Sequence, residues 1–209
     1  SEMCIRDRGE TLITGIGQGY TQTTPLQLCM MTAQIANGGF AVKPKIIVDS
    51  NPISYEDAKQ SMESGLLFDT DSEELLDKKL FKNQRNIKIV QEAMFASTNE
   101  RFGTSYKSRI DDPKYQFAGK TGTAQVKRIS KRERELDLEL EQIPYKDRDH
   151  ALYVAYGPYV NPRYALSIIV EHGGSGSKAA APIAKKLFKL IIDRHDLRNK
   201  QSNFERITV

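Results

Sequence analysis

Residues 151–174, ALYVAYGPYVNPRYALSIIVEHGG, constrain the fold more than any other part of the chain. Two apolar runs flank a turn between Pro158 and Pro162, a pattern typical of a β-hairpin. The next segment, SKAAAPIAKKLFKLIIDRH, predicts an amphipathic helix that ends near His195. We expect its inward face to carry four aliphatic residues: Ile183, Leu187, Leu190 and Ile191.

A further strand is expected just before this hairpin, at Tyr115–Ala118, and continues through a Lys-Thr-Gly segment to Val126. Three consecutive antiparallel strands followed by a helix predict an α/β domain, with an antiparallel sheet flanked by helices. The charged residues 127–150 between the first two strands indicate a solvated loop or an exposed helix.

Two helices are expected before the sheet. Thr24 can cap the first helix, Pro25 suits its first turn, and Asn37-Gly38-Gly39 can end it. The second helix begins at about Asn86. We expect apolar faces made of Leu26, Cys29, Met30, Ala33, Ile35 and Ala36 in the first helix, and of Ile87, Val90, Ala93 and Met94 in the second. Residues 50–84 between them are polar and predict a surface excursion with a short helical piece near Glu73–Phe81.

Composition excludes several classes of function. The net charge of +4 comes from 31 basic and 27 acidic residues, a balance that does not indicate a nucleic-acid partner. Cys4 and Cys29 have no metal-ligand spacing, and the three histidines are scattered, so we expect no metal and no cofactor. The longest apolar runs, such as Ala165–Val170, are much shorter than a spanning helix.

The segment FAGKTGTAQV, residues 117–126, places a cation, a hydroxyl, a glycine and a second hydroxyl in a row on a strand. Gly122 lets another backbone approach, so a peptide could add to the strand by main-chain hydrogen bonds. Lys120 supplies a positive field, the Thr121 hydroxyl can bind a carboxylate, and the Thr123 N–H could donate to a developing oxyanion. A Lys-Thr-Gly triplet alone is a weak signal, because an ordinary strand with an exposed lysine explains it equally well.

Four segments in order resemble the transpeptidase domain of class B penicillin-binding proteins: GIGQGYTQTTPLQL, AGKTGTAQV, YGPYVNPRYALSIIVEHGG and AAAPIAKK. Among these proteins, the resemblance is greatest to the group that acts in cell elongation in Gram-negative bacteria, and it covers residues from Gly9 to about His195. It implies the fold shared by penicillin-binding transpeptidases and serine β-lactamases. It also implies an acyl-serine reaction, in which SxxK, SxN and KTG motifs form the site. Carried onto this chain, Lys120 and the Thr123 amide become catalytic, and Thr121, Gly122 and Thr123 bind substrate.

The resemblance also implies partners and a location. The substrates are peptidoglycan stem peptides ending in D-Ala-D-Ala, and β-lactams bind the same site. Membrane proteins of the elongation complex, including a glycosyltransferase, are expected partners, on the periplasmic face of the bacterial inner membrane.

The chain departs from the family pattern because no SxxK precedes the Lys-Thr-Gly segment. One Ser-x-x-Lys match, Ser175–Lys178, follows it, and we expect this match to form a turn and helix cap. The Ser97-Thr98-Asn99 match to SxN lies on the second helix, and we expect a structural role for it. We therefore expect the nucleophile to lie upstream of Gly9, so that residues 9–196 are the C-terminal part of a transpeptidase domain and inactive alone.

Residues 1–8 fit no pattern and are interpreted as a non-native junction, whereas 197–209 are interpreted as a tail. Two alternative functions stay open: a non-catalytic penicillin-recognising sensor or scaffold, and a serine β-lactamase. A nucleotide site at GIGQG is disfavoured, because the segment lacks the third glycine and a Walker lysine.

Overall fold

The computed structural model describes residues 22–42, 79–126 and 139–207, together with a few isolated positions between Gly9 and Pro44, and it describes side chains as far as Arg198. Within these ranges, three strands form an antiparallel sheet of order β1-β2-β3. The strands are β1 (Ala118–Ala124), β2 (His150–Gly157) and β3 (Tyr164–Val170). The predicted sheet and its hairpin are therefore confirmed.

The first strand begins three residues later than predicted. The Tyr115 N–H donates to the Asp112 carbonyl at 3.0 Å, and the Lys114 N–H donates to the Asp112 side chain at 2.9 Å. These bonds hold residues 112–115 in a turn, so that extended pairing starts only at Ala118.

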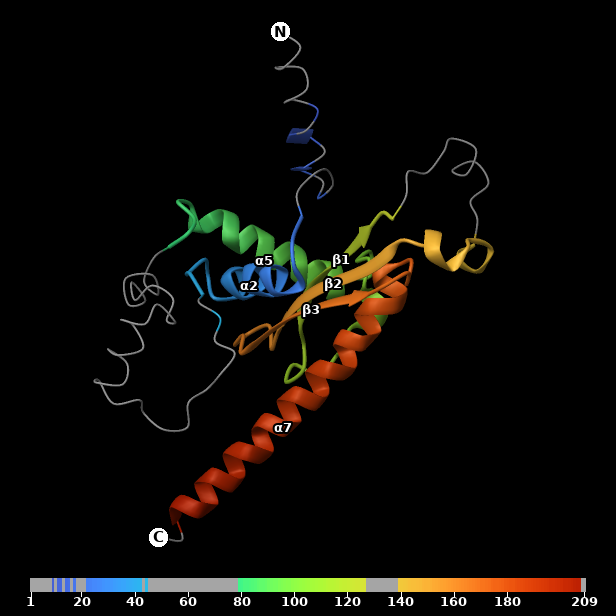
Figure 1. Ribbon diagram of the computed structural model, residues 1–209. Helices are drawn as coiled ribbons and strands as arrows, with labels where there is room; N and C mark the ends of the chain where they lie inside the picture. Colours follow the sequence, from blue (N-terminus) through green and yellow to red (C-terminus); the bar gives the residue numbers. More distant parts are fainter. Residues whose placement is uncertain are drawn as a thin grey trace, which may run out of the picture.

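Each face of the sheet is covered by different helices (Figure 1). The side chains of Ala151, Tyr153 and Ala155 in β2 pack in one cluster with helix α7 (Ala181–Ile207). The intervening side chains, such as Tyr156, pack against helices α2 (Pro25–Ala36) and α5 (Gln84–Asn99). This alternation is the two-residue period of a strand buried on both faces.

Helix α2 begins as predicted. The Thr24 hydroxyl accepts a hydrogen bond from the Gln27 N–H, and the Gln27 side chain accepts one from the Thr24 N–H, which completes a capping box. Gly38 and Gly39 follow with φ of 87° and 95°, as expected for a helix that ends in left-handed glycines. Leu26, predicted to face inward, is instead 51% exposed.

Helix α5 buries a different stripe from the predicted one. Ile87 and Met94 are buried as expected, whereas Val90 is 40% exposed and Ala93 is exposed. The same face also carries two polar residues, the half-buried Gln91 and the buried Thr98. The Gln91 amide donates to the carbonyl oxygens of Ile35 and Ala36 at 2.7 and 3.3 Å, which joins α5 to the end of α2.

Helix α7 also packs against the sheet with a different face from the predicted one. Leu190 is 66% exposed and Ile183 is 40% exposed, while Leu187 and Ile191 are half-buried. The buried stripe of α7 is Ala181, Ala184, Phe188 and Ile192, and it continues from Ala180 in the preceding turn; the small alanines allow the helix to approach the sheet. Phe188 stacks on Phe117 with ring centroids 4.8 Å apart.

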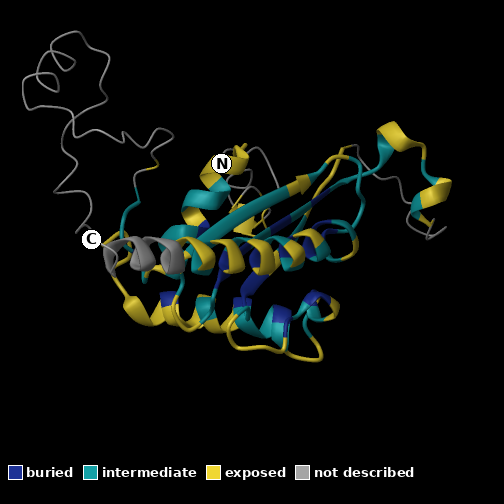
Figure 2. Cartoon of the chain, turned by 90° about the horizontal axis from the view of Figure 1, so that it is seen from below, coloured by how far each residue is buried: buried dark blue, intermediate teal, exposed yellow. Residues whose placement is uncertain are grey.

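The far end of α7 extends beyond the sheet (Figure 1). The helix was expected to end near His195 but continues to Ile207, because no glycine or proline interrupts it after Pro182. Figure 2 shows buried residues where α7 and the strands meet and exposed residues along the outer sides of the helices. No helix in the described ranges is long and apolar enough to cross a bilayer.

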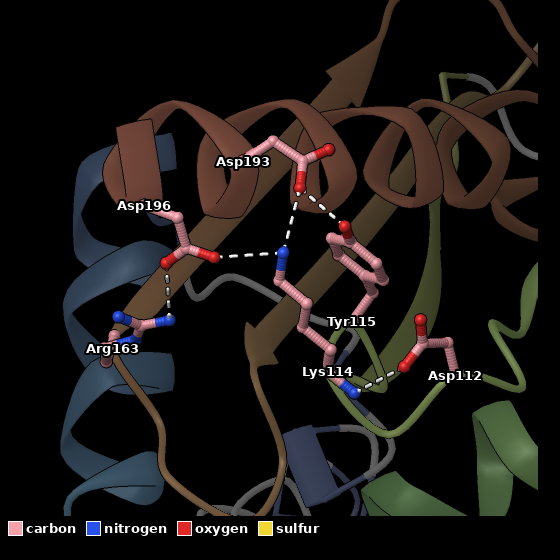
Figure 3. Close-up of polar contacts among 6 residues, drawn as sticks. All are labelled: Asp112, Lys114, Tyr115, Arg163, Asp193 and Asp196. Atoms are coloured by element: carbon pink, nitrogen blue, oxygen red, sulfur yellow. Dashed lines mark hydrogen bonds and ion pairs between the residues drawn. The ribbon is translucent and has the colours of Figure 1, made fainter. Parts of the chain in front are cut away.

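A charged cluster joins α7 to the turn before β1 (Figure 3). Lys114 Nζ lies 3.0 Å from Asp196 and 3.2 Å from Asp193, and the Tyr115 hydroxyl donates to Asp193 at 2.5 Å. These contacts raise the pKa of Lys114, chiefly through its hydrogen bond to Asp196, and the same bond lowers the pKa of Asp196. Tyr115 and then Lys114 lower the pKa of Asp193.

Candidate active-site edge

Strand β1 lies at the edge of the sheet, and its outer backbone groups are met by side chains. The Phe117 carbonyl accepts from Asn99 Nδ2 at 2.9 Å, and the Gly119 carbonyl accepts from the Thr98 hydroxyl at 3.4 Å. The Thr121 carbonyl accepts from Lys120 Nζ at 2.8 Å. In an antiparallel strand, the backbone N–H and C=O groups of every second residue point to the same side. Because the carbonyls of Phe117, Gly119 and Thr121 point outward, the Thr123 N–H also points away from β2.

The end of α5 therefore covers one half of the edge and leaves the other half uncovered. Among the described residues, the covered half is at Phe117 and Gly119, and the uncovered half is at Thr121 and Thr123. Thr121 is half-buried, and Lys120 and Thr123 are exposed. An edge strand whose outer side has no neighbouring strand can accept an extended peptide as an additional strand.

The four residues singled out from the sequence are brought together at this uncovered half. Lys120 and Gly122 lie on the α2 and α5 face, and Thr121 and Thr123 lie on the α7 face, as the strand period predicts. Lys120 nevertheless bends toward the edge, so that its ammonium lies 3.4 Å from the Thr121 hydroxyl. A cation, a hydroxyl and an outward N–H thus share one short stretch of edge, which suits a bound carboxylate and a developing oxyanion.

A buried cluster of hydroxyl groups supports the strand from the α7 face. The Tyr153 hydroxyl lies 2.9 Å from the Thr98 hydroxyl and donates to Ser105 at 3.1 Å. Burial raises the pKa of Tyr153, with opposing contributions from Ser105 and Thr98, so the phenol stays protonated and able to donate. A methyl group on Gly119 would overlap the Tyr153 hydroxyl, so the strand can pass over this cluster only with glycine at position 119.

The Ser97-Thr98-Asn99 match has the structural contacts expected of it. Thr98 and Asn99 join α5 to β1 through the carbonyl contacts described above. Asn99 also donates to the Phe95 carbonyl within the helix at 3.0 Å.

The Ser175–Lys178 match lies on the opposite face of the sheet from the Lys120 side chain. Its residues enter the π-helical turn Gly176–Ala180, which leads into α7. A methyl group on Gly176 would lie 2.8 Å from the Gly122 carbonyl oxygen, so the turn packs directly against the backbone of β1 and β2. The predicted turn is confirmed, but the Ser175 hydroxyl bonds Ser177 at 3.0 Å and makes no side-chain cap.

Two of the three histidines, which are scattered in the sequence, meet in the fold. The ring centroids of His150 and His172 are 4.8 Å apart, and His150 Nδ1 accepts from the His172 N–H at 2.9 Å. His172 Nδ1 lies 3.0 Å from the Arg148 carbonyl, so its proton is on that nitrogen. The described residues contain no group of three potential metal ligands.

Thr104 is the residue at this edge that the sequence did not single out. Its hydroxyl lies 3.3 Å from the Thr121 hydroxyl and 3.3 Å from the Ser97 hydroxyl. The available signal was a Gly103-Thr104-Ser105 turn after the helix, which by itself indicates only a helix end.

Several predicted features lie outside the described residues: most of GIGQGYTQ, nearly all of the 50–84 excursion, and residues 127–138. Of the predicted helical piece near Glu73–Phe81, only residues 79–81 are described, and they are not helical, because Lys79 forms a bridge with Phe40.

Comparison with known proteins assigns the chain to one family. Residues 7–189 match the model of the penicillin binding protein transpeptidase domain. The chain is 31% identical over 186 residues to peptidoglycan D,D-transpeptidase MrdA of Salmonella typhimurium, and 30% identical over 192 residues to that of Haemophilus influenzae. These alignments cover 89% and 90% of this chain but 27% and 26% of the relatives.

Solved structures show the same relationship. Pseudomonas aeruginosa PBP2, crystallised in complex with WCK 5153, is 34% identical with a TM-score of 0.63, and the match covers 87% of this chain and 33% of that one. Helicobacter pylori PBP2, in a complex with MreC, is 32% identical with a TM-score of 0.60, covering 87% and 28%. The chain thus spans about a quarter to a third of the length of its relatives, and the predicted fold class is confirmed.

Proposed function

The chain belongs to the penicillin binding protein transpeptidase domain family, and we propose that it forms the substrate-binding edge of a peptidoglycan D,D-transpeptidase that acts in cell elongation. One observation carries the proposal. Among the described residues, α5 leaves the edge of β1 uncovered at Thr121 and Thr123, and the Lys120 ammonium lies beside it.

In this proposal, the residues of the uncovered edge bind the substrate and stabilise its reacting carbonyl. A stem peptide ending in D-Ala-D-Ala pairs with β1 as an additional strand. The Thr121 hydroxyl donates to its terminal carboxylate, and Lys120 supplies a positive field there. The Thr123 N–H donates to the oxygen of the penultimate D-Ala carbonyl as negative charge develops on it.

The covalent step uses a serine that we place upstream of Gly9. Its oxygen attacks the penultimate D-Ala carbonyl, and the terminal D-Ala leaves with a proton on its amine. The amine of a neighbouring stem peptide then attacks the acyl-serine, which forms the cross-link and releases the serine. A β-lactam enters the same site as a carboxylate and a reactive carbonyl, and it remains attached as an acyl-enzyme.

We further propose that the protein works on the periplasmic face of the inner membrane with other elongation proteins, including a glycosyltransferase. The proposal is supported by a relative from Helicobacter pylori, which forms a complex with MreC. Co-purification of the tagged full-length protein with a glycosyltransferase from the membrane fraction tests this, and a purely cytoplasmic distribution would contradict it.

Two measurements on the full-length protein test the proposed activity. Labelled penicillin should attach at one serine upstream of Gly9, and a stem pentapeptide with an acceptor should release D-Ala. Penicillin labelling without D-Ala release would favour the sensor or scaffold function. Rapid hydrolysis of the acyl-enzyme would favour a β-lactamase, and absence of labelling would contradict all three.

A further inference from the structure

Three hydroxyl groups from three segments form a chain that ends at the proposed carboxylate site. Ser97 lies in the last turn of α5, Thr104 in the loop that follows, and Thr121 in β1. Their oxygens are 3.3 Å apart at each step, and Lys120 Nζ lies 3.4 Å from the Thr121 oxygen. Thr104 is itself exposed, so the chain lies at the surface of the uncovered edge.

Hydrogen bonds of its neighbour Ser105 hold the loop that carries Thr104 against the end of α5. The Ser105 N–H and the Ser105 hydroxyl both donate to the Ser97 carbonyl at 3.0 Å, and the buried Tyr153 hydroxyl donates to Ser105 at 3.1 Å. A methyl group on Gly103 would overlap the same Ser97 carbonyl, so the loop lies directly against the helix end. The position of Thr104 is therefore fixed by a buried neighbour rather than by its own contacts.

The donors and acceptors of the chain can be ordered once a carboxylate is bound. An ammonium only donates, so the Thr121 oxygen accepts from Lys120. If Thr121 donates its single proton to a carboxylate, its remaining lone pair can accept only from Thr104. Thr104 in turn can accept from Ser97, and hydrogen bonds in such a series polarise one another.

We propose that Thr104 is a positioning residue, which directs the Thr121 proton toward the carboxylate of the bound peptide or β-lactam. The inference rests on the proposed function, because it assumes that Thr121 binds a carboxylate. In this role, the loop after α5 helps the site to distinguish ligands that carry a free carboxylate from ligands that do not. Thr104 acts through Thr121 and does not itself touch the substrate.

The test compares acylation of the full-length protein by benzylpenicillin and by its methyl ester, which lacks the carboxylate. Thr104→Val should reduce the acylation rate constant for the acid about tenfold, on the scale of one hydrogen bond to a charged group. The rate constant for the ester should not change, and Thr104→Ser should restore the parent rate for the acid. Lys107→Met, an exposed residue of the same loop, is the matched control and should keep the parent ratio of acid to ester.

The ratio of the two rate constants is independent of the fraction of protein that is folded, so a less stable variant still gives a result. An unchanged ratio in Thr104→Val would overturn the inference. So would an equal loss for acid and ester that serine does not restore, because that pattern is structural. A parent protein that neither ligand acylates would instead contradict the proposed function.

Discussion

At the scale of single residues, Gly119 and Gly122 of β1 have different surroundings. A methyl group at position 119 would overlap the buried Tyr153 hydroxyl, whereas one at position 122 would make a tight contact of 3.3 Å with Leu152 Cβ and meet no other atom of the described residues within 4 Å. The first glycine is therefore required by the core, whereas an alanine at position 122 needs only a small adjustment of Leu152, and we expect the second glycine to be required by the ligand that binds the edge.

Substitution by alanine should separate these two requirements. Gly119→Ala should destabilise the full-length protein by about 1–3 kcal/mol, the typical effect of overpacking a core. Gly122→Ala should lower the melting temperature less than Gly119→Ala, because only Leu152 must adjust, but it should reduce penicillin acylation by about 10²-fold, because a small displacement of a reacting ligand is costly. Thermal melting and acylation kinetics check the pair, and equal effects on stability would contradict the distinction.

Lys120 is the residue with the strongest expected effect on chemistry. Lys120→Ala in the full-length protein should cut acylation by roughly 10²-fold or more, on the scale of losing one electrostatic contributor to a transition state. The side chain is exposed, so the melting temperature should change little. If the acylation rate were unchanged, Lys120 would have no part in the site.

At the uncovered edge, contacts between consecutive residues were predictable from the sequence, whereas contacts between residues far apart in the sequence were not. Lys120 to Thr123 are consecutive, so a strand brings them together whatever the rest of the fold does. Thr104 and Thr121 are seventeen residues apart and meet only because a buried hydroxyl cluster fixes the intervening loop. No local pattern encodes that meeting, and so Thr104 was not predicted.

At the scale of elements, the strands and the starts of the helices were predictable, but the buried helix faces were not. The hairpin and the Thr24 cap have local signals, namely the Pro-rich turn and the side-chain cap. In α5 the inward face includes the half-buried Gln91 and the buried Thr98, which an apolar pattern overlooks because their polar groups have partners in α2 and β1. In α7 small alanines face the sheet while Leu190 faces outward.

The contact of α7 with the turn before β1 makes a prediction about pH. The pKa values of Asp193 and Asp196 are lowered in the fold, so their contribution to stability is present above about pH 4, the ordinary carboxyl pKa, and is lost as the pH falls through the lower folded values. The pKa of Lys114 is raised, so its contribution is constant through neutral pH and is lost only in strong alkali.

Lys114→Met should therefore weaken the acid dependence of stability. Between pH 7 and pH 3, the fall in melting temperature should be smaller in this variant than in the parent full-length protein. Lys107→Met is the control, because Lys107 is exposed and has no ion pair within the described ranges. The groups at the cluster are exposed, so the effect should be modest and should shrink in high salt. An acid dependence identical to the parent's would contradict a stabilising role for the cluster.

At the scale of the whole molecule, neither serine motif of the described ranges is hydrogen-bonded to the Lys120 side chain. Ser175–Lys178 lies with α7, on the face opposite Lys120, and Ser97 lies at the end of α5 with its hydroxyl on Thr104. The 209-residue chain alone should therefore form no covalent adduct with labelled penicillin. Mass spectrometry after labelling checks this, and stoichiometric modification of a serine within residues 9–196 would overturn the expectation of an upstream nucleophile.

The central claim is that the uncovered half of β1 holds the carboxylate and the reacting carbonyl. A crystal structure of the full-length protein acylated by benzylpenicillin tests it most directly. We predict the acyl carbonyl oxygen about 2.7–3.1 Å from the Thr123 nitrogen, with the carboxylate on the Thr121 hydroxyl beside Lys120. An acyl group whose carbonyl and carboxylate both lie away from residues 120–123 would contradict the account.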